Sequence, residues 1–219
     1  MSLSLILYLG KQDKKMIGYY NYTVILTYIG AVFGFTGITY TFNGNLRMAI
    51  ICLMVAGFCD MFDGKIASTM KRTDQEKRFG IQIDSLSDLV CFGVLPALIV
   101  WKLTNGEPIY LSISIAYLLC ALVRLAWFNV DEEERQNNEN GGRAIYLGLP
   151  VTTTALILPI ATGIVQLLSL PVGKILPWVL LAVAVAFIAP FKLKKPGFIG
   201  KIIMVAIGII GLVAVMLGG

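Results

Sequence analysis

The chain has 219 residues, of which 57% are hydrophobic and 14% charged, with a net charge of +5 and a mean hydropathy of +0.79. Soluble domains contain roughly 25% charged residues, so this composition excludes an ordinary soluble protein and indicates an integral membrane protein. Histidine is absent, which excludes Ser-His-Asp and Cys-His catalysis and a His-ligated zinc site. The basic residues form no aromatic-interleaved surface, so we expect anionic lipid headgroups and phosphorylated substrates as partners, and no nucleic acid.

In chain order, residues 1–20 combine a short apolar stretch with lysines, which is typical of an interfacial segment. A membrane-spanning helix needs about 20 apolar residues. Seven later segments have this character: 22–42, 46–70, 81–103, 109–130, 146–169, 172–191 and 198–217. The predicted fold is therefore all-α, a polytopic integral membrane helical bundle. We expect six core transmembrane helices plus one additional helix within a single domain, 21–219.

Lysine and arginine are distributed unevenly between the two ends of these spans. If the N-terminus is cytoplasmic, thirteen of the eighteen lie on the cytoplasmic side and only Arg47, Lys102 and Lys174 on the other. Cytoplasmic loops carry an excess of Lys and Arg. We therefore expect a multi-pass protein of the cell membrane, with the 71–80 loop and the acidic 131–143 loop in the cytoplasm.

Four aspartates interrupt the second and third predicted spans near their cytoplasmic ends. Asp60 and Asp63 are three residues apart and Asp84 and Asp88 four apart, so each pair lies on one helix face. The short connection makes the two spans antiparallel neighbours and brings these faces together.

These carboxylates need a counter-charge. A carboxylate inside a span costs about 2.5–3.5 kcal/mol, so four cost on the order of 10 kcal/mol, which is comparable to the whole stability of a domain. Two divalent cations would balance four carboxylates. Mg²⁺ or Mn²⁺, with Ca²⁺ as the alternative, prefers such oxygen ligands, whereas zinc prefers nitrogen and sulfur.

The aspartates belong to a longer pattern, D-x-x-D-G-x-x-A over 60–67 and G-x-x-x-D-x-x-x-D over 80–88. This pattern resembles the signature of the CDP-alcohol phosphotransferase family at seven fixed positions. Two features depart from it: Ser68 stands where the family has arginine, and eleven residues rather than eight separate it from Gly80. Lys65, Lys71 and Arg72 are the candidates for the contact of the missing arginine.

The resemblance implies that Asp60, Asp63, Asp84 and Asp88 hold two divalent cations around the pyrophosphate of a CDP-linked lipid. It also implies that Asp88 is the general base on the acceptor hydroxyl. The residues that we expect to contact the nucleotide or the CDP-lipid are Gly64, Ala67, Ser68, Lys71, Arg72 and Gly80, with Asn21 and Thr27 from the first span. Gly64 and Ala67 could equally be helix-packing residues.

Three further stretches, FGIQIDSLSDLVCFGVLPALI, ALVRLAWFNV and YLGLPVTTTALILP, resemble the phosphatidylserine synthase branch of that family. Arg124 is the candidate for binding the serine carboxylate or the lipid phosphate, and a structural counter-ion to the aspartates is the alternative. Asn129 either orients the acceptor or caps the span. In the second stretch, Trp127 replaces an arginine of the branch pattern.

The branch resemblance implies transfer of a phosphatidyl group from CDP-diacylglycerol to L-serine, with release of CMP, by a homodimer in the bilayer. Three alternatives stay open from the residues. The acceptor could be glycerol 3-phosphate or an inositol compound, the aspartates could form the path of a cation transporter, or the chain could be a non-catalytic lipid-binding scaffold.

Overall fold

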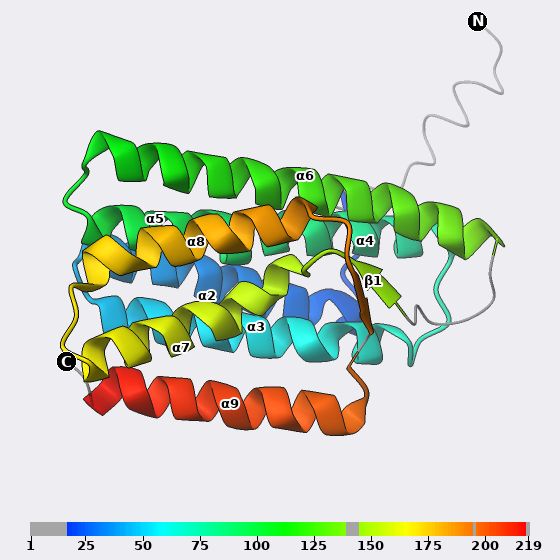
Figure 1. The fold of residues 1–219 in the computed structure, drawn as a ribbon. Coiled ribbons are helices and arrows are strands. Elements are labelled where there is room, and N and C mark those ends of the chain that lie inside the picture. The colour runs from blue at the N-terminus through cyan, green and yellow to red at the C-terminus, as the bar shows by residue number, and fades with distance from the viewer. Residues whose placement is uncertain (1–16, 139–144, 195, 218–219) are drawn as a thin grey trace, which may run out of the picture.

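The computed structural model describes residues 17–138, 145–194 and 196–217, which form a bundle of long helices (Figure 1). In chain order the helical elements are η1 (Tyr22–Val24), α2 (Ile25–Phe42), α3 (Leu46–Ala67), α4 (Asp74–Asp88), η2 (Leu89–Val94), α5 (Leu95–Leu103), α6 (Pro108–Asn138), η3 (Val151–Thr153), α7 (Thr154–Leu167), α8 (Val172–Ile188) and α9 (Phe198–Leu217). Two strands, β1 (Ile145–Leu147) and β2 (Lys192–Lys194), complete the described elements.

The helices lie side by side, with α2 packed along α3, α6 along α8 and α7 along α9. The turn from α5 to α6 and the turn from α7 to α8 lie at one end of the bundle, whereas β1 and β2 lie at the other, together with the start of α4 (Figure 1). Asn105, Gly106 and Ser169 adopt positive φ angles of 53°, 79° and 54° in these turns. Both connections are therefore tight turns.

Small residues let the helices approach closely. A Cβ placed on Gly163 in α7 would lie 2.5 Å from the Cβ of Ala214 in α9, and one on Gly34 in α2 would lie 2.6 Å from Sγ of Cys91. Both separations are shorter than real atoms tolerate, so these positions require glycine. The first contact brings α7 close to α9, and the second brings α2 close to η2.

Three helical stretches of the described residues are long and apolar enough to cross a membrane: Tyr22–Phe42, Asp74–Leu103 and Pro108–Arg135. Shorter apolar helices cover Val151–Leu167, Val172–Ile188 and Ile202–Leu217. Helix α3 has 22 residues but includes Arg47, Asp60, Asp63 and Lys65, which lower its hydropathy. The structure thus confirms a predominantly helical protein with membrane-capable helices, and the count of six spans plus one stays a prediction.

Two predicted loops are partly helical. The third span was expected to begin at residue 81, but α4 begins at Asp74 because Thr73 and Glu76 form a capping box. The backbone N–H of Thr73 donates to Glu76 at 2.8 Å, and that of Glu76 donates to the Thr73 hydroxyl at 3.3 Å. The predicted acidic loop was wrong in its first part, because α6 continues to Asn138. Within it, Arg135 pairs with Glu132 at 2.6 Å.

The fold also contains a short sheet that an all-α prediction omits. The predicted span 146–169 begins instead with β1, which pairs antiparallel with β2 so that Tyr146 faces Leu193. Helix α7 starts only at Thr154. The predicted interfacial segment lies mostly outside the described residues, as does the remainder of the acidic loop, 139–143.

Candidate metal and substrate site

Helices α3 and α4 form an antiparallel pair that sets the depth of the four aspartates. Helix α3 ends at Ala67, where the Ser68 hydroxyl donates to the Lys65 carbonyl at 2.7 Å. Six residues later the capping box starts α4. At 1.5 Å per residue, Asp60 lies about 10 Å from the end of α3 and Asp84 about 15 Å from the start of α4. The two acidic faces therefore meet inside the bundle rather than at its tip.

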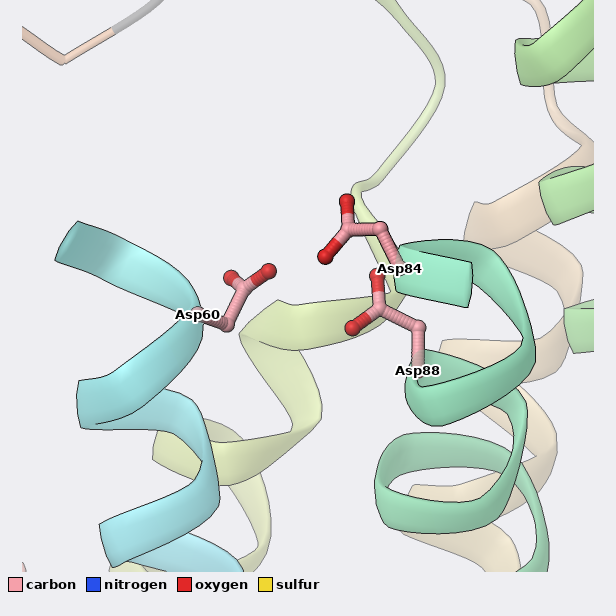
Figure 2. A group of neighbouring side chains, drawn as sticks. All are labelled: Asp60, Asp84 and Asp88. Carbon is pink, nitrogen blue, oxygen red and sulfur yellow. The ribbon is translucent and has the colours of Figure 1, made fainter. Parts of the chain in front are cut away.

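Asp60, Asp84 and Asp88 converge at one point between these helices. Each offers a carboxylate oxygen, and these oxygens lie within 4.8 Å of one another. Figure 2 shows Asp60 reaching from α3 toward Asp84 and Asp88 on α4. All three side chains are partly buried. The structure thus brings together residues separated by 28 positions in the chain, as the resemblance implied.

Asp63 lies beside this group. Its carboxyl interacts with Asp84 and Asp60, although it is not among the three that share the closest spacing. The four carboxylates therefore form one electrostatic group, and their mutual repulsion is strong where water is scarce.

Side-chain hydrogen bonds hold α4 between α2 and α6. The hydroxyl of Ser85 donates to Oδ1 of Asn129 in α6 at 2.7 Å, and that of Ser87 donates to the Thr27 carbonyl in α2 at 3.2 Å. Both serines neighbour an aspartate of the cluster. Asn129 lies within α6, which continues for nine more residues, so the alternative that it caps the span is wrong.

The approach to the aspartates is bordered by two glycines. A Cβ on Gly64, one turn after Asp60, would meet nothing within 4 Å, so this face of α3 is open. A Cβ on Gly80, one turn before Asp84, would lie 3.1 Å from Nη1 of Arg72. The Arg72 guanidinium therefore lies over the α4 face that carries Asp84.

The remaining predicted nucleotide contacts are spread around this approach. Ser68 and Lys71 are exposed in the connection from α3 to α4, and Ala67 is half-buried at the end of α3. Asn21 caps η1 and donates from Nδ2 to Glu76 at 3.3 Å. Thr27 is buried in α2, with 7% of its surface exposed.

Arg124 lies deeper in the bundle than the candidates in the connection from α3 to α4. It is 5% exposed, and its Nε donates to the Leu149 carbonyl at 3.1 Å. Its guanidinium carbon lies 5.4 Å from the ring centre of Trp127 and 5.6 Å from that of Phe128. The side chain is thus oriented by the segment that leads from β1 into α7.

Three features near the site were not anticipated from the sequence. The capping box could have been found, since a threonine three residues before a glutamate is the usual signature of a helix start. The π-helical segment η2 directly after Asp88 has no recognised signature. Nor does the bond from the Tyr117 hydroxyl to the Phe92 carbonyl.

The donor set fits a hard divalent cation. Oxygens on opposite sides of one ion at 2.0–2.6 Å are about 4–5 Å apart, and the three carboxylate oxygens lie within 4.8 Å of one another. The group contains carboxylates alone, without histidine or cysteine, which favours Mg²⁺, Mn²⁺ or Ca²⁺ over zinc. Such an ion would also offset the repulsion between the aspartates.

Comparison with known proteins points to the same chemistry. The chain is 31% identical over 144 residues to archaetidylserine synthase of Methanothermobacter thermautotrophicus, which covers 65% of this chain and 58% of the relative. It is 37% identical over 111 residues to CDP-diacylglycerol–serine O-phosphatidyltransferase of Saccharomyces cerevisiae, covering 49% and 39%. It is 23% identical over 156 residues to the enzyme of the same name from Bacillus subtilis, covering 70% and 77%. The chain thus spans about half the length of the first two relatives.

A family model agrees with these relatives. The model for CDP-alcohol phosphatidyltransferases matches residues 20–190. That range contains all four aspartates, both glycines of the approach and Arg124. The chain therefore belongs to the CDP-alcohol phosphatidyltransferase family.

Proposed function

We propose that the protein transfers a phosphatidyl group from CDP-diacylglycerol to the hydroxyl of L-serine, forming phosphatidylserine and releasing CMP. The convergence of Asp60, Asp84 and Asp88 between α3 and α4 is the observation that carries this proposal. Family membership supports the reaction type. The three relatives described above are an archaetidylserine synthase and two CDP-diacylglycerol–serine O-phosphatidyltransferases, which supports serine as the acceptor.

In this proposal Asp60, Asp63, Asp84 and Asp88 hold two divalent cations, Mg²⁺ or Mn²⁺ with Ca²⁺ as the alternative. When bound, the cations neutralise the pyrophosphate and the charge that develops on it. The carboxylates keep that charge balance at one depth, because α3 and α4 both pack against α2 and α4 also packs against α6.

Asp88 is the general base. It lies one helical turn, about 6 Å, further along α4 than Asp84, on the side away from the exposed connection. Its carboxylate takes the proton of the serine hydroxyl as the serine oxygen bonds to the lipid-bearing phosphorus. The bond from that phosphorus to the bridging oxygen breaks, and CMP departs with the electron pair.

The nucleotide lies over the open face of α3 and the Gly80 face of α4. The small residues Gly64, Ala67 and Gly80 leave room for the nucleotide, and Ser68 and Lys71 lie at its edge. Asn21, which precedes η1, and Thr27 in α2 lie on its other side. Among the basic candidates, Arg72 is favoured over Lys65 and Lys71, because its guanidinium already lies against Gly80. It would supply the charge that the family arginine supplies at the position of Ser68.

The acceptor lies on the α6 side. Asn129 reaches Ser85, the neighbour of Asp84, and so it can orient the serine hydroxyl. Arg124 is held by the Leu149 carbonyl and two aromatic rings and is the candidate for the serine carboxylate. A guanidinium recognises a carboxylate well because both groups are planar and can form paired hydrogen bonds.

The site faces the cytoplasm in this proposal, and the domain 21–219 acts as a homodimer in the cell membrane, preceded by the interfacial segment 1–20. The excess of lysine and arginine at the aspartate end of the helices supports the orientation. The dimer rests on the family resemblance.

The acceptor is tested by measuring CMP release from CDP-diacylglycerol with L-serine, glycerol 3-phosphate or inositol 1-phosphate. Purified protein is stripped with EDTA and supplied with Mg²⁺, Mn²⁺ or Ca²⁺. We expect release with serine only, and only with a divalent cation.

The Asp88→Asn variant gives the background, with a loss of about 10²–10⁴-fold. Asp74→Asn, an exposed aspartate in the first turn of the same helix, is the matched control and should retain activity. CMP release that does not depend on serine would refute serine as the acceptor. An Asp88→Asn variant as active as the wild type would refute Asp88 as the general base.

A further inference from the structure

The helix that carries Asp84 and Asp88 changes its winding directly after Asp88. Residues Leu89–Val94 form the π-helical segment η2, and the backbone N–H of Leu95 donates to the Val90 carbonyl, five residues back. Pro96 follows, in the first turn of α5. Proline has no N–H, so it cannot donate to the carbonyl four residues back, which is that of Phe92.

The side chain of Tyr117 supplies a donor to that carbonyl. Its hydroxyl, reaching from α6, donates to the Phe92 carbonyl. The same oxygen lies 2.9 Å from Oγ1 of Thr154 at the start of α7. Since the single tyrosine proton goes to the carbonyl, Thr154 donates to Tyr117. Tyr117 has no exposed surface and Thr154 is 1% exposed, so neither contacts solvent.

This chain of hydrogen bonds matters because a π-helical turn holds one more residue than an α-helical turn. One residue corresponds to about 100° of rotation around a helix. The side chains of Leu95 and Val100 in α5 are fully buried and Ile99 is 1% exposed, so α5 cannot rotate easily. If η2 relaxed to an α-helix, the rotation would pass to α4, and Asp84 and Asp88 would turn away from Asp60.

We infer that Tyr117, oriented by Thr154, is a positioning residue that holds the π-helical turn after Asp88 and thereby keeps Asp84 and Asp88 facing Asp60. It touches no substrate and acts through the Phe92 carbonyl. The inference rests on the proposed metal site, because the helix rotation that Tyr117 maintains is the one that directs the proposed metal ligands Asp84 and Asp88 toward Asp60.

The test compares Tyr117→Phe, Thr154→Val, Pro96→Ala and the Pro96→Ala/Tyr117→Phe double variant, each as the full chain in detergent or nanodiscs. The readouts are Mn²⁺ affinity, measured by electron paramagnetic resonance without substrate, and kcat and KM for serine. We expect Tyr117→Phe to weaken Mn²⁺ binding and lower kcat by about ten-fold, as expected for an unsatisfied buried carbonyl. KM for serine should change by no more than about two-fold from the wild-type value, because the substitution displaces the metal ligands Asp84 and Asp88 and leaves the serine contacts in place.

The double variant separates positioning from general destabilisation. Alanine at 96 restores the backbone donor to Phe92, so Pro96→Ala and Tyr117→Phe act on the same carbonyl and their effects should not multiply. Thr162→Val is the matched control for Thr154→Val, because Thr162 is equally buried in α7 but its hydroxyl donates within its own helix, to the Leu158 carbonyl at 2.8 Å. It should bind Mn²⁺ like the wild type.

Two results would overturn the inference: Mn²⁺ affinity in Tyr117→Phe equal to that of the wild type, or effects of Pro96→Ala and Tyr117→Phe that multiply. The wild-type titration tests the metal site by itself. If the wild type binds no Mn²⁺, the proposed function fails and the inference fails with it. If the wild type binds and Tyr117→Phe binds equally, only the inference fails.

Discussion

Serine at position 68 carries no charge, and in this chain its hydroxyl bonds back to the Lys65 carbonyl at 2.7 Å. The nearby guanidinium of Arg72 lies against Gly80 instead, over the α4 face that leads to Asp84. Arg72 lies four residues after Ser68, in the connection between α3 and α4, so in the proposed site its side chain can take over the phosphate contact of the family arginine. The missing arginine is thus compatible with catalysis.

Removal of this guanidinium should weaken binding of the CDP-lipid more than the chemical step. Arg72→Ala is expected to raise KM for CDP-diacylglycerol about ten-fold or more, since a charge-assisted hydrogen bond contributes about 1.5–3 kcal/mol. Ser68→Arg introduced into Arg72→Ala should recover most of that loss, because it restores the charge at the end of α3. Initial-rate kinetics with varied CDP-diacylglycerol measures both effects.

Lys77→Ala provides the control for a lost positive charge, since Lys77 is exposed and pairs with Asp74 at 3.2 Å. It should leave KM unchanged. A KM for Arg72→Ala equal to that of Lys77→Ala would remove Arg72 from the nucleotide site.

At the scale of the element, α4 depends on how it begins and what holds its sides. The Thr73–Glu76 capping box satisfies two backbone N–H groups that the first turn otherwise leaves without partners. Asn21 adds a bond to Glu76 from the segment before α2, and Arg78 pairs with Glu133 of α6 at 3.2 Å. Asp84 and Asp88 therefore project from a helix that is anchored at its start as well as at its centre.

Removing the cap should lower stability while leaving the chemistry intact. Thr73→Ala is expected to cost about 1 kcal/mol of unfolding free energy, or a fall in Tm of about 2–4 °C for a chain of this size. Thr73→Ser keeps the hydroxyl and should match the wild type. Thermal unfolding in detergent compares the three proteins, and an alanine variant as stable as the serine variant would show that the cap contributes nothing.

At the scale of the whole molecule, the end of α3, the start of α4 and the strand pair lie at the same end of the bundle (Figure 1), and α4 and β2 carry the exposed residues Lys77, Arg78, Lys192 and Lys194. A membrane protein inserts with the lysine- and arginine-rich ends of its spans on the cytoplasmic side, so the basic end of this bundle is expected to face the cytoplasm. In the proposed orientation, the site would meet cytoplasmic serine and the headgroup of a CDP-lipid in the inner leaflet.

Orientation can be measured by labelling single introduced cysteines with a membrane-impermeant maleimide. Lys77→Cys in α4 should react only after the cells are permeabilised, whereas Glu107→Cys in the turn between α5 and α6 should react in intact cells. Both positions are exposed. The unsubstituted chain is the control for the native cysteines, of which Cys52, Cys59 and Cys91 are buried. The reverse pattern of labelling would place the site outside.

Much of the site could be read from spacing because it lies on two helices. Residues three or four apart on a helix share a face whatever the helix packs against, so the pairs Asp60–Asp63 and Asp84–Asp88 were predicted correctly as neighbours. Helix positions followed from apolar length in the same way, and the predicted bounds 198–217 agree with those of α9. Boundaries were wrong where polar sequence continued a helix, as at Asp74 and after Asp131, because hydropathy detects the membrane-embedded part of a helix and not its whole length.

By itself, the sequence determined the helical class, the membrane environment, the acidic chemistry and the family pattern, because each depends on composition or on spacing within one helix. Only the tertiary structure decided which carboxylates meet, that Arg72 lies against Gly80, that Asn129 reaches Ser85, and that Tyr117 bonds to Phe92. These contacts join residues from different helices. Their geometry depends on how whole helices rotate and approach, which no local pattern encodes.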